Sequence, residues 1–320
     1  MTQKRLSVVI PAHNEESNIL AIHAAIRAAL KDLDVNLEMI FVDDGSCDAT
    51  AERVSSLASR DDGVRLLSFT RNFGHQAALL AGLHAATGDA IITMDCDLQH
   101  PPELIPKMVS AWRSGYEVVQ MVRDETIGAG LAKRVMSRNF YRLMNLLSDT
   151  PVTAGAADFQ LLDRAALDAL LRLGDHRPFL RGMVSWLGFP TIALHYKAGA
   201  RASGSSSYTW RKMISMAVDA VTAFSVKPLR LAFYIGCLSA LLSIVYLVYI
   251  FNELLAGRTV EGWTSLMVVL LFLGASQLVT LGIIGEYIGR IYDQTRGRPR
   301  YIVRRQDAGS MSESRPASPH

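Results

Sequence analysis

Cysteine is scarce in this chain, and the pattern of a secretory signal is missing. Of 320 residues only three are cysteine, Cys47, Cys96 and Cys237. Their irregular spacing fits neither a disulfide framework nor a zinc site, so we expect a reducing compartment. The first residues, MTQKRLSVVIPAHNEE, contain no long apolar run followed by a small-residue cleavage site. We therefore expect no cleaved secretory signal.

Two long stretches contain no charged residue, at 231–251 and at 263–285. As a helix, each is long enough to cross about 30 Å of hydrocarbon. Uncharged runs of this length are rare in water-soluble cores, so we predict two transmembrane helices. Apolar residues at helical spacing just before the first stretch predict interfacial amphipathic helices at 208–230.

Basic residues flank these stretches unequally. Lys227 and Arg230 precede the first stretch, and Arg258 is the one basic residue of the connecting loop. The second stretch is followed by Arg290, Arg296, Arg298, Arg300, Arg304 and Arg305. The positive-inside rule then places both termini in the cytoplasm. We expect a multi-pass protein of the inner (plasma) membrane. The segment 286–320 is expected to be a basic cytoplasmic tail with a disordered end.

Short apolar runs alternate with helical patterns over the first 125 or so residues. The predicted strands are 6–10, 38–44, 64–69, 90–95 and 116–122, and a further short strand is expected at 158–162. Asn14 is expected to cap the first helix, and Gly88 to end the third. This alternation predicts an α/β domain over residues 1–207, with a doubly wound, mostly parallel sheet.

Polar residues gather where four of these strands end, at 11–16, 43–48, 71–75 and 95–100. In doubly wound sheets, ligands bind beyond the carboxyl ends of the strands. We therefore expect these four segments to line one crevice.

Two like charges, Asp95 and Asp97, stand at the end of a buried strand on either side of Cys96. Such a pair is unfavourable unless a cation, basic side chains or solvent compensates for it. Carboxylate oxygens suit Mg²⁺ or Mn²⁺, and Gln99 could add a neutral oxygen. The pattern therefore predicts a divalent metal that also binds a diphosphate.

Four ordered motifs carry a family resemblance: VVIPAHNEE, FVDDGSCDAT, RNFGHQAALLAGLHAATGD and MDCDLQHPPE. They resemble the signatures of family 2 glycosyltransferases, in the polyprenyl-phosphate branch that includes dolichyl-phosphate mannose synthases and bactoprenol glucosyltransferases. The resemblance covers roughly residues 5–305. The segment RASGSSSYTWRK, followed by two spans, is most similar to the bactoprenol type.

The resemblance implies a GT-A-type fold and an inverting transfer from a nucleotide sugar, UDP-glucose first, to undecaprenyl phosphate, with Mg²⁺ or Mn²⁺. The nucleotide-binding residues implied by position are Pro11, His13, Glu15, Asp43, Asp44, Arg71 and Asp95. The implied metal ligands are Asp95, Asp97 and Gln99, and the implied catalytic residues are Asp97 and Asp158.

Basic residues are implied for the acceptor phosphate, at Arg123, Lys133, Arg134 and Arg201. Arginine suits a phosphate because its guanidinium donates as a fork. The motif that starts at Arg201 departs from the usual form, since Ser207 stands where a lysine often precedes the tyrosine. A phosphate monoester with a second pKa of about 6 is largely a dianion near neutral pH, so attack needs no strong general base. Asp158 would orient the acceptor or stabilise positive charge at the anomeric carbon.

Several alternatives remain open from the sequence. Two alternatives share the expected fold. One is a GDP-mannose-dependent polyprenyl-phosphate mannose synthase, and the other is a non-catalytic membrane scaffold. A processive polysaccharide synthase is disfavoured because the chain has no Q-x-x-R-W motif and few spans. An oxidoreductase is disfavoured because no G-x-G-x-x-G follows the first strand. Nucleic-acid binding is not expected, because the basic run at 290–305 flanks a span. Close packing at Gly282, Gly285 and Gly289 would suit a homo-oligomer.

Overall fold

The computed structural model describes residues 3–123, 156–174, 179–196, 227–256 and 262–307. The chain forms two compact units. The first contains a large sheet with its helices, and the second contains two long helices. Residues 298–307, at the end of the described chain, belong to the first unit.

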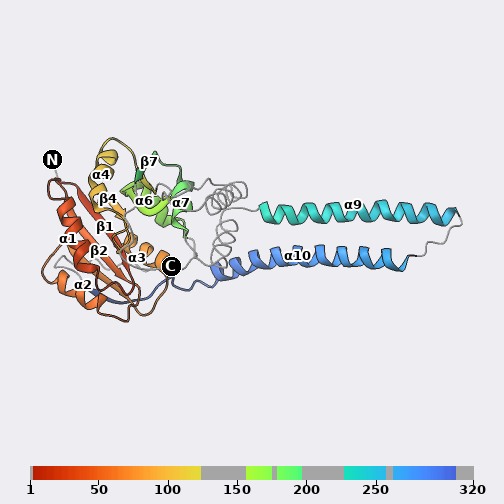
Figure 1. Ribbon diagram of the computed structural model, residues 1–320, viewed down its shortest axis with the longest axis horizontal. Helices are drawn as coiled ribbons and strands as arrows, with labels where there is room; N and C mark the ends of the chain where they lie inside the picture. Colours follow the sequence, from red (N-terminus) through yellow and green to blue (C-terminus); the bar gives the residue numbers. More distant parts are fainter. Residues whose placement is uncertain (1–2, 124–155, 175–178, 197–226, 257–261, 308–320) are drawn as a thin grey trace, which may run out of the picture. The chain divides into compact units, whose positions relative to one another are not determined.

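An eight-stranded sheet forms the centre of the first unit (Figure 1). The strands are β1 (Arg5–Ala12), β2 (Asn36–Asp43), β3 (Val64–Phe69), β4 (Ala90–Thr93), β5 (Val118–Arg123), β6 (Ala156–Asp163), β7 (Thr191–Tyr196) and β8 (Val303–Asp307). Their order across the sheet is β7-β5-β6-β4-β1-β2-β3-β8. β4, β1, β2 and β3 are parallel neighbours, as are β5 and β7, whereas β6 and β8 run antiparallel to their partners. The predicted α/β fold with a mostly parallel sheet is confirmed.

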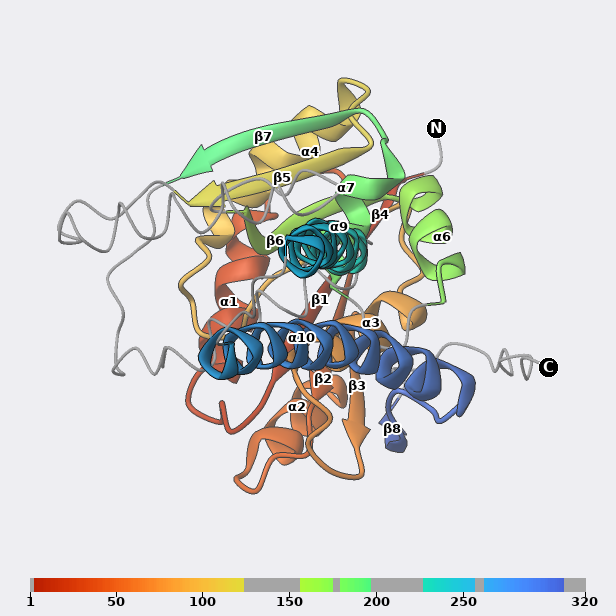
Figure 2. The ribbon, with the colours of Figure 1, turned by 90° about the vertical axis from the view of Figure 1, so that its right-hand side faces the viewer.

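Helices cover both faces of this sheet. They are α1 (Ile19–Ala29), α2 (Thr50–Ala58), α3 (His75–Ala85), the 3-10 turn η1 (Pro102–Leu104), α4 (Ile105–Arg113), α6 (Arg164–Arg172) and α7 (Leu180–Leu187). Val8 and Phe41 lie in one buried cluster with Ile22 of α1. On the other face, α3 packs against β1 (Figure 2). The approach is so close that a Cβ added to Gly82 would overlap the Val9 side chain. Successive residues of a strand face opposite layers, and both layers are covered here. Residues 8–10 of β1 and 39–42 of β2 are therefore apolar without alternation.

Two local predictions are wrong. Asn14 does not cap the first helix, because α1 begins at Ile19 and its N-cap is Asn18. Asn14 has a φ of 56°, and its side-chain oxygen accepts from the Cys47 N–H at 2.9 Å. The third helix ends at Ala85, and the chain is already extended at the next residue, before Gly88 is reached.

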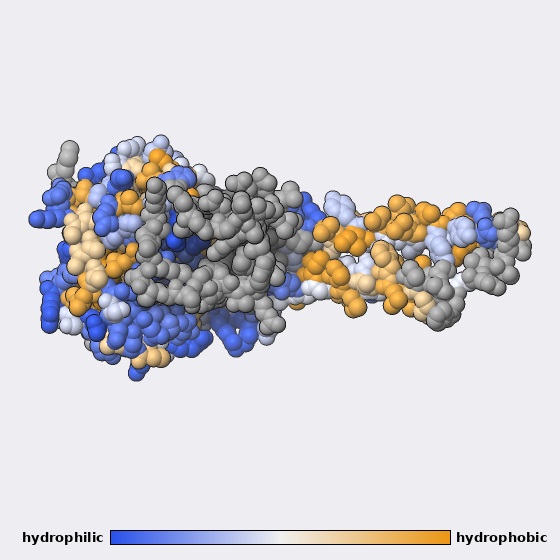
Figure 3. Space-filling model, in the orientation of Figure 1, coloured by the Kyte–Doolittle hydropathy of each residue, from blue (hydrophilic) through white to orange (hydrophobic). Residues whose placement is uncertain are grey.

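The described part of the second unit consists of α9 (Lys227–Leu255) and α10 (Trp263–Thr295). Within them, Leu229–Glu253 has a mean hydropathy of 2.3 and Val269–Thr295 one of 1.7, so both are long and apolar enough to cross a membrane. Their apolar side chains are largely exposed, as Figure 3 shows along both helices, with Leu278 at 72%. The two predicted apolar helices are therefore present and extend beyond the predicted bounds. Of the interfacial region predicted at 208–230, residues 208–226 lie outside the described residues, and the remainder belongs to α9.

The segment predicted as a basic tail contributes a strand to the sheet. β8 pairs antiparallel with β3, so that Ser68 lies opposite Arg305 and Phe69 opposite Val303. Gly297 and Pro299 mark a turn before this strand, but its arginines were interpreted as membrane-flanking charge and the strand was not predicted. Residues 308–320 lie outside the described residues.

Candidate active site

One edge of the sheet collects the polar segments predicted to share a crevice. β4, β1, β2 and β3 are parallel neighbours, so their carboxyl ends meet at this edge. β5 is antiparallel to β6, and β6 is antiparallel to β4, so β5 and β7 also end there and β6 begins there. The segments 11–16, 43–48, 71–75 and 95–100 therefore lie where this class of sheet binds ligands.

The turn after β4 fixes the two predicted metal-binding aspartates. His100 Nδ1 accepts from the Asp95 N–H at 3.1 Å, which closes the turn. Inside it Leu98 has a φ of 58°, an unfavourable left-handed conformation for this residue. Gln99 donates twice to Asp97, from its N–H at 3.0 Å and from Nε2 at 2.6 Å. Gln99, predicted as a neutral metal ligand, here orients a carboxylate.

One carboxylate oxygen of Asp95 is buried without a hydrogen bond. In the part of the chain that the structure describes, Asp95 Oδ1 has no hydrogen-bond partner, although His75 Nε2 lies 3.4 Å away. The other oxygen lies 3.7 Å from His100 Nε2. Burial raises the pKa of Asp95. The imidazoles of His100 and His75 act to lower it, and the negative charges of Asp158 and Asp97 raise it further. A bound cation would remove this electrostatic cost.

The two carboxylates fit a divalent cation that shares its coordination sphere with a substrate. Among the described residues, no group of three His, Cys, Asp or Glu side chains is placed to hold a metal ion. Mg²⁺ is usually bound by one or two protein carboxylates together with water and substrate phosphates. Asp95 and Asp97 match that donor set when a nucleoside diphosphate supplies the remaining oxygens.

Asp158, near the start of β6, is the centre of a buried ionic cluster. Arg181 of α7 donates to both of its oxygens, from Nε at 2.7 Å and from Nη2 at 2.9 Å. His75 Nε2 lies 3.4 Å from Oδ2, and Gln76 donates to the same oxygen at 3.4 Å. Burial acts to raise the pKa of Asp158, but the contacts with His75 and Arg181 outweigh it and lower the pKa. Asp158 is therefore ionised and paired at neutral pH, which suits an orienting role better than proton acceptance.

His75 and Arg181 are functional candidates that the sequence reasoning did not assign. His75 is the first residue of α3, and its Nε2 lies between Asp95 and Asp158, 3.4 Å from each. Burial lowers the pKa of His75, but the hydrogen bond to Asp158 and the charge of Asp95 raise it more. The position of His75 at a polar strand end was a usable signal. Arg181 lies within a helix and follows no strand, so no local pattern marked it.

The end of β1 supplies three of the predicted nucleotide-binding residues. Pro11 is buried within β1. His13 is exposed, with Nδ1 2.9 Å from the carbonyl oxygen of Asp44. Burial raises the pKa of Glu15, and the nearby charge of Asp97 contributes to the rise. The structure thus brings Glu15 close to the aspartate pair.

Asp43 and Asp44, predicted to contact the nucleoside, are buried and bonded to protein groups. Asp43 accepts from the Ser46 N–H at 3.0 Å and from the Ser68 hydroxyl at 2.7 Å. Asp44 accepts from the backbone N–H groups of Phe73 at 2.6 Å and of Gly74 at 2.9 Å. Asp44 therefore holds the loop between β3 and α3 in place.

That loop presents Arg71, the residue predicted to face the diphosphate or the sugar. Arg71 is exposed, and its guanidinium carbon lies 4.1 Å from the ring centroid of Phe73. A guanidinium over an aromatic face is held by a cation–π contact. The loop thus sets the direction of Arg71 before any ligand binds.

The predicted acceptor-phosphate residues are only partly described. Arg123 ends β5 at the crevice edge and is exposed. Burial raises the pKa of Tyr196 at the end of β7, and the positive charge of Arg123 opposes this rise. Lys133, Arg134 and Arg201 lie outside the described residues.

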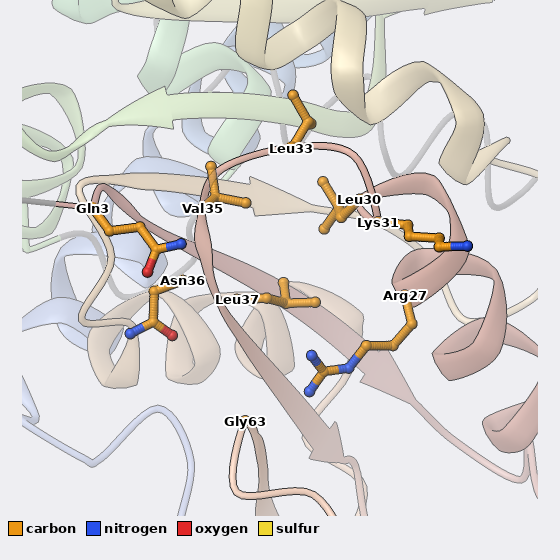
Figure 4. A pocket seen from close by; sticks show the side chains of 9 residues that line it. All are labelled: Gln3, Arg27, Leu30, Lys31, Leu33, Val35, Asn36, Leu37 and Gly63. Atoms are coloured by element: carbon orange, nitrogen blue, oxygen red, sulfur yellow. The ribbon is translucent and has the colours of Figure 1, made fainter.

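A pocket of about 510 Å³ lies at the opposite edge of the sheet (Figure 4). It is lined by Gln3, Arg27, Leu30, Lys31, Leu33, Val35, Asn36, Leu37 and Gly63. These residues surround the amino ends of β2 and β3, and none of them is a predicted site residue. The site residues and this pocket are therefore separate features of the domain.

Comparison with known families gives two matches. Residues 7–171 match the family described as glycosyl transferase family 2. Residues 227–291 match the family described as the GtrB C-terminal hairpin. The first match covers β2 to β6 and most of β1, and the second covers α9 and most of α10.

Comparison with individual proteins gives relatives over nearly the whole chain. The uncharacterized glycosyltransferase YkcC of Bacillus subtilis is 40% identical over 300 residues, 93% of each chain. The prophage-derived bactoprenol glucosyl transferase of Shigella flexneri is 38% identical over 96% of this chain and 99% of its own. Among solved structures, glucosyl-3-phosphoglycerate synthase from Mycobacterium tuberculosis, in complex with Mn²⁺, uridine diphosphate and phosphoglyceric acid, is 23% identical. The match covers 68% of this chain and 76% of that one, with a TM-score of 0.47.

Proposed function

Because the chain belongs to glycosyl transferase family 2, we propose that it transfers glucose from UDP-glucose to the phosphate of undecaprenyl phosphate in the membrane. The transfer inverts the anomeric carbon and yields polyprenyl-phosphate glucose and UDP. Relatives named bactoprenol glucosyl transferase, 38% identical over 96% of the chain, support glucose as the sugar and a polyprenyl acceptor. The match to the GtrB C-terminal hairpin supports a reaction at a membrane surface.

The observation that carries the proposal is the unsatisfied oxygen of Asp95 at the end of β4. Among the described residues this buried oxygen accepts no hydrogen bond, which is unfavourable unless a ligand completes the site. The second carboxylate, on Asp97, has a fixed orientation two residues away. Together they would hold Mg²⁺ or Mn²⁺, which, when bound, supplies positive charge to the diphosphate leaving group.

The residues around the aspartate pair would then bind and orient the donor. The loop that Asp44 holds presents Arg71 at the crevice edge, where its positive charge suits the diphosphate or the sugar. Pro11, His13, Glu15 and Asp43 surround the same strand ends. Their backbone and side-chain groups would contact the nucleoside.

The acceptor side of the crevice requires positive charge and a fixed geometry more than a base. A phosphate monoester near neutral pH carries its nucleophilic oxygen already deprotonated. Arg123, with Lys133, Arg134 and Arg201, would bind this phosphate. The pair of Asp158 with Arg181 would position the acceptor side against the anomeric carbon, since Asp158 is ionised and doubly hydrogen-bonded.

The flanking charges support a cytoplasmic site. Arginines are concentrated at and after the end of α10, from residue 290 onward, whereas Arg258 is the only basic residue of the connecting loop. The positive-inside rule then orients both termini toward the cytoplasm, where nucleotide sugars are made available. Both helices would span the membrane, so that the enzyme meets its lipid acceptor within the same plane.

The direct test is sugar transfer by the purified full chain. Labelled UDP-glucose, UDP-galactose, UDP-N-acetylhexosamines and GDP-mannose would each be incubated with undecaprenyl phosphate and Mg²⁺ or Mn²⁺. We expect labelled lipid from UDP-glucose and loss of the label when the metal is chelated. Labelled lipid from GDP-mannose alone would establish the mannose synthase instead, and no transfer from any donor would refute an enzyme of this class.

The metal role is tested by Asp97→Asn. This change keeps the shape of the side chain and removes its charge, so we expect transfer to fall by about 100-fold or more. Asp32→Asn, at an exposed position in the connection after α1, is the matched control and should retain full activity. Normal turnover by the Asp97 variant, with folded protein in the membrane fraction, would rule out metal binding at this pair.

A further inference from the structure

We propose that residues 301–307 form a C-terminal brace that positions Arg71 for the sugar donor. The brace consists of Tyr301, Ile302 and strand β8, and it acts on the loop between β3 and α3. The donor part of this inference rests on the proposed function. The brace itself rests on contacts within the first unit alone.

Backbone hydrogen bonds join the brace to the end of β3 and continue into the loop. β8 pairs antiparallel with β3 from Leu66 to Phe69, with a register shift after Ser68 (Figure 2). Beyond the last strand residue, the Thr70 N–H donates to the Ile302 carbonyl oxygen at 3.1 Å. Without β8, β3 would be an exposed edge strand with its carboxyl end unpaired.

Aromatic contacts continue from the brace to Arg71. The rings of Tyr301 and Phe69 stack with centroids 5.1 Å apart and an angle of 12° between their planes. Phe69 meets Phe73 edge-on, with centroids 5.7 Å apart at 88°. The guanidinium of Arg71 lies over Phe73 at 4.1 Å. Tyr301 therefore supports the ring on which Arg71 rests, through one buried phenylalanine.

The opposite side of the loop is held by the β2 side of the crevice. Asp44 accepts from the N–H groups of Phe73 and Gly74 at 2.6 and 2.9 Å. Gly45 has a φ of 65°, and a Cβ there would overlap the backbone of Arg71. The loop is thus fixed between a segment near residue 45 and a segment near residue 301. A substitution in the brace changes the second of these contacts and leaves the residues of the crevice in place.

This arrangement gives the last described part of the chain a role at the donor site. β8 follows α10 in sequence, whereas the strands of the crevice precede α9. The domain that binds the donor is therefore built from chain on both sides of the hairpin. Tyr301 contacts neither the aspartate pair nor Arg71 directly, so it is a positioning residue.

The test compares Tyr301→Ala with Tyr301→Phe in the full-length, membrane-bound enzyme. The alanine variant loses the stacked ring, and the phenylalanine variant keeps it. We expect Tyr301→Ala to raise the KM for the nucleotide sugar by about fivefold, the factor expected for one aromatic pair, while kcat and the KM for the lipid change little. Tyr301→Phe should match the wild type.

Hydrogen exchange separates the brace from the proposed function, because it needs no substrate. In Tyr301→Ala we expect faster amide exchange at Thr70, Phe73 and Gly74, and unchanged exchange in α1 and β1. Unchanged exchange at the loop would refute the brace, whether or not the enzyme transfers sugar. Faster exchange with an unchanged donor KM would refute the positioning of Arg71. A wild type that transfers no sugar would overturn the proposed function and with it the donor role, while the exchange data would still decide whether the brace exists.

Discussion

Replacing Arg181 with alanine tests whether Asp158 depends on its ionic partner. The Asp158 side chain is 8% exposed and that of Arg181 31%. Removal of Arg181 would leave a buried carboxylate with the His75 imidazole at 3.4 Å and one long hydrogen bond from Gln76. Of the two groups that oppose burial only His75 would remain, so the pKa of Asp158 would rise and the folded state would lose stability at neutral pH.

The size of the loss follows from the exposure of the two partners. Breaking a fully buried ion pair from one side costs about 3–5 kcal/mol. Arg181 is nearly one third exposed and His75 stays in place, so we expect about 2–3 kcal/mol in this case. For a domain of this size, that corresponds to a fall in Tm of about 4–12 °C.

The assay is thermal unfolding of the detergent-solubilised chain for Arg181→Ala, Asp158→Asn and the double variant. The double variant removes both charges, so it should be more stable than the sum of the single losses predicts, by about 1–2 kcal/mol. Arg181→Lys should recover part of the loss, since an ammonium supplies charge but no fork. Arg172→Ala, at the exposed end of α6, is the control and should leave Tm unchanged. Strictly additive losses would show that Asp158 and Arg181 do not act as a pair.

Three further outcomes are expected. Burial acts to raise the pKa of Glu38, but hydrogen bonds from hydroxyl, amide and Arg65 groups lower it. The stability this carboxylate contributes is therefore complete above its ordinary pKa of 4.5 and is lost as the pH falls through the lower folded value; Glu38→Gln should flatten the dependence of Tm on pH in that range. Gly45→Ala should lower Tm and slow transfer, because its positive φ and the adjacent loop backbone both exclude a Cβ; an unchanged Tm would contradict this. The hydroxyl oxygens of Ser239 in α9 and Ser276 in α10 lie 3.3 Å apart. Ser239→Ala should lower the free energy of unfolding of the hairpin, measured in bicelles, by only about 0.6 kcal/mol. A loss of several kcal/mol would contradict so small a role.

Much of the fold could be predicted because its signals are local. The run VRLLSF predicted a strand at 64–69, and β3 has these bounds, since the strand is covered on both faces and four of its six side chains are apolar. The two uncharged stretches likewise lie within α9 and α10. Helix ends were less predictable. Asn14 looks like a cap in sequence, but the chain after β1 first turns at a positive φ and starts the helix at Ile19.

The site was predicted where its residues follow strands, and missed where they do not. Asp95 and Asp97 are marked by the end of an apolar run, and the sheet topology brings them beside the other strand ends. Asp158 pairs with Arg181 across 23 positions of sequence, and with His75 across 83. No periodicity relates residues at such separations. Their contact depends on how α7 and α3 pack, which a single sequence does not specify.

The sequence by itself determined the class of the sheet, the edge at which polar segments gather, the acidic pair and the two apolar helices. Each of these follows from residues that are neighbours in the chain, where apolar periodicity and charge act over a few positions. Only the tertiary structure decided that ionised Asp158 pairs with Arg181, that Asp44 accepts from the loop between β3 and α3, and that β8 pairs with β3 at the end of the sheet. Those outcomes arise from long-range packing, because burial and pairing set the state of a polar group only when distant segments have come together.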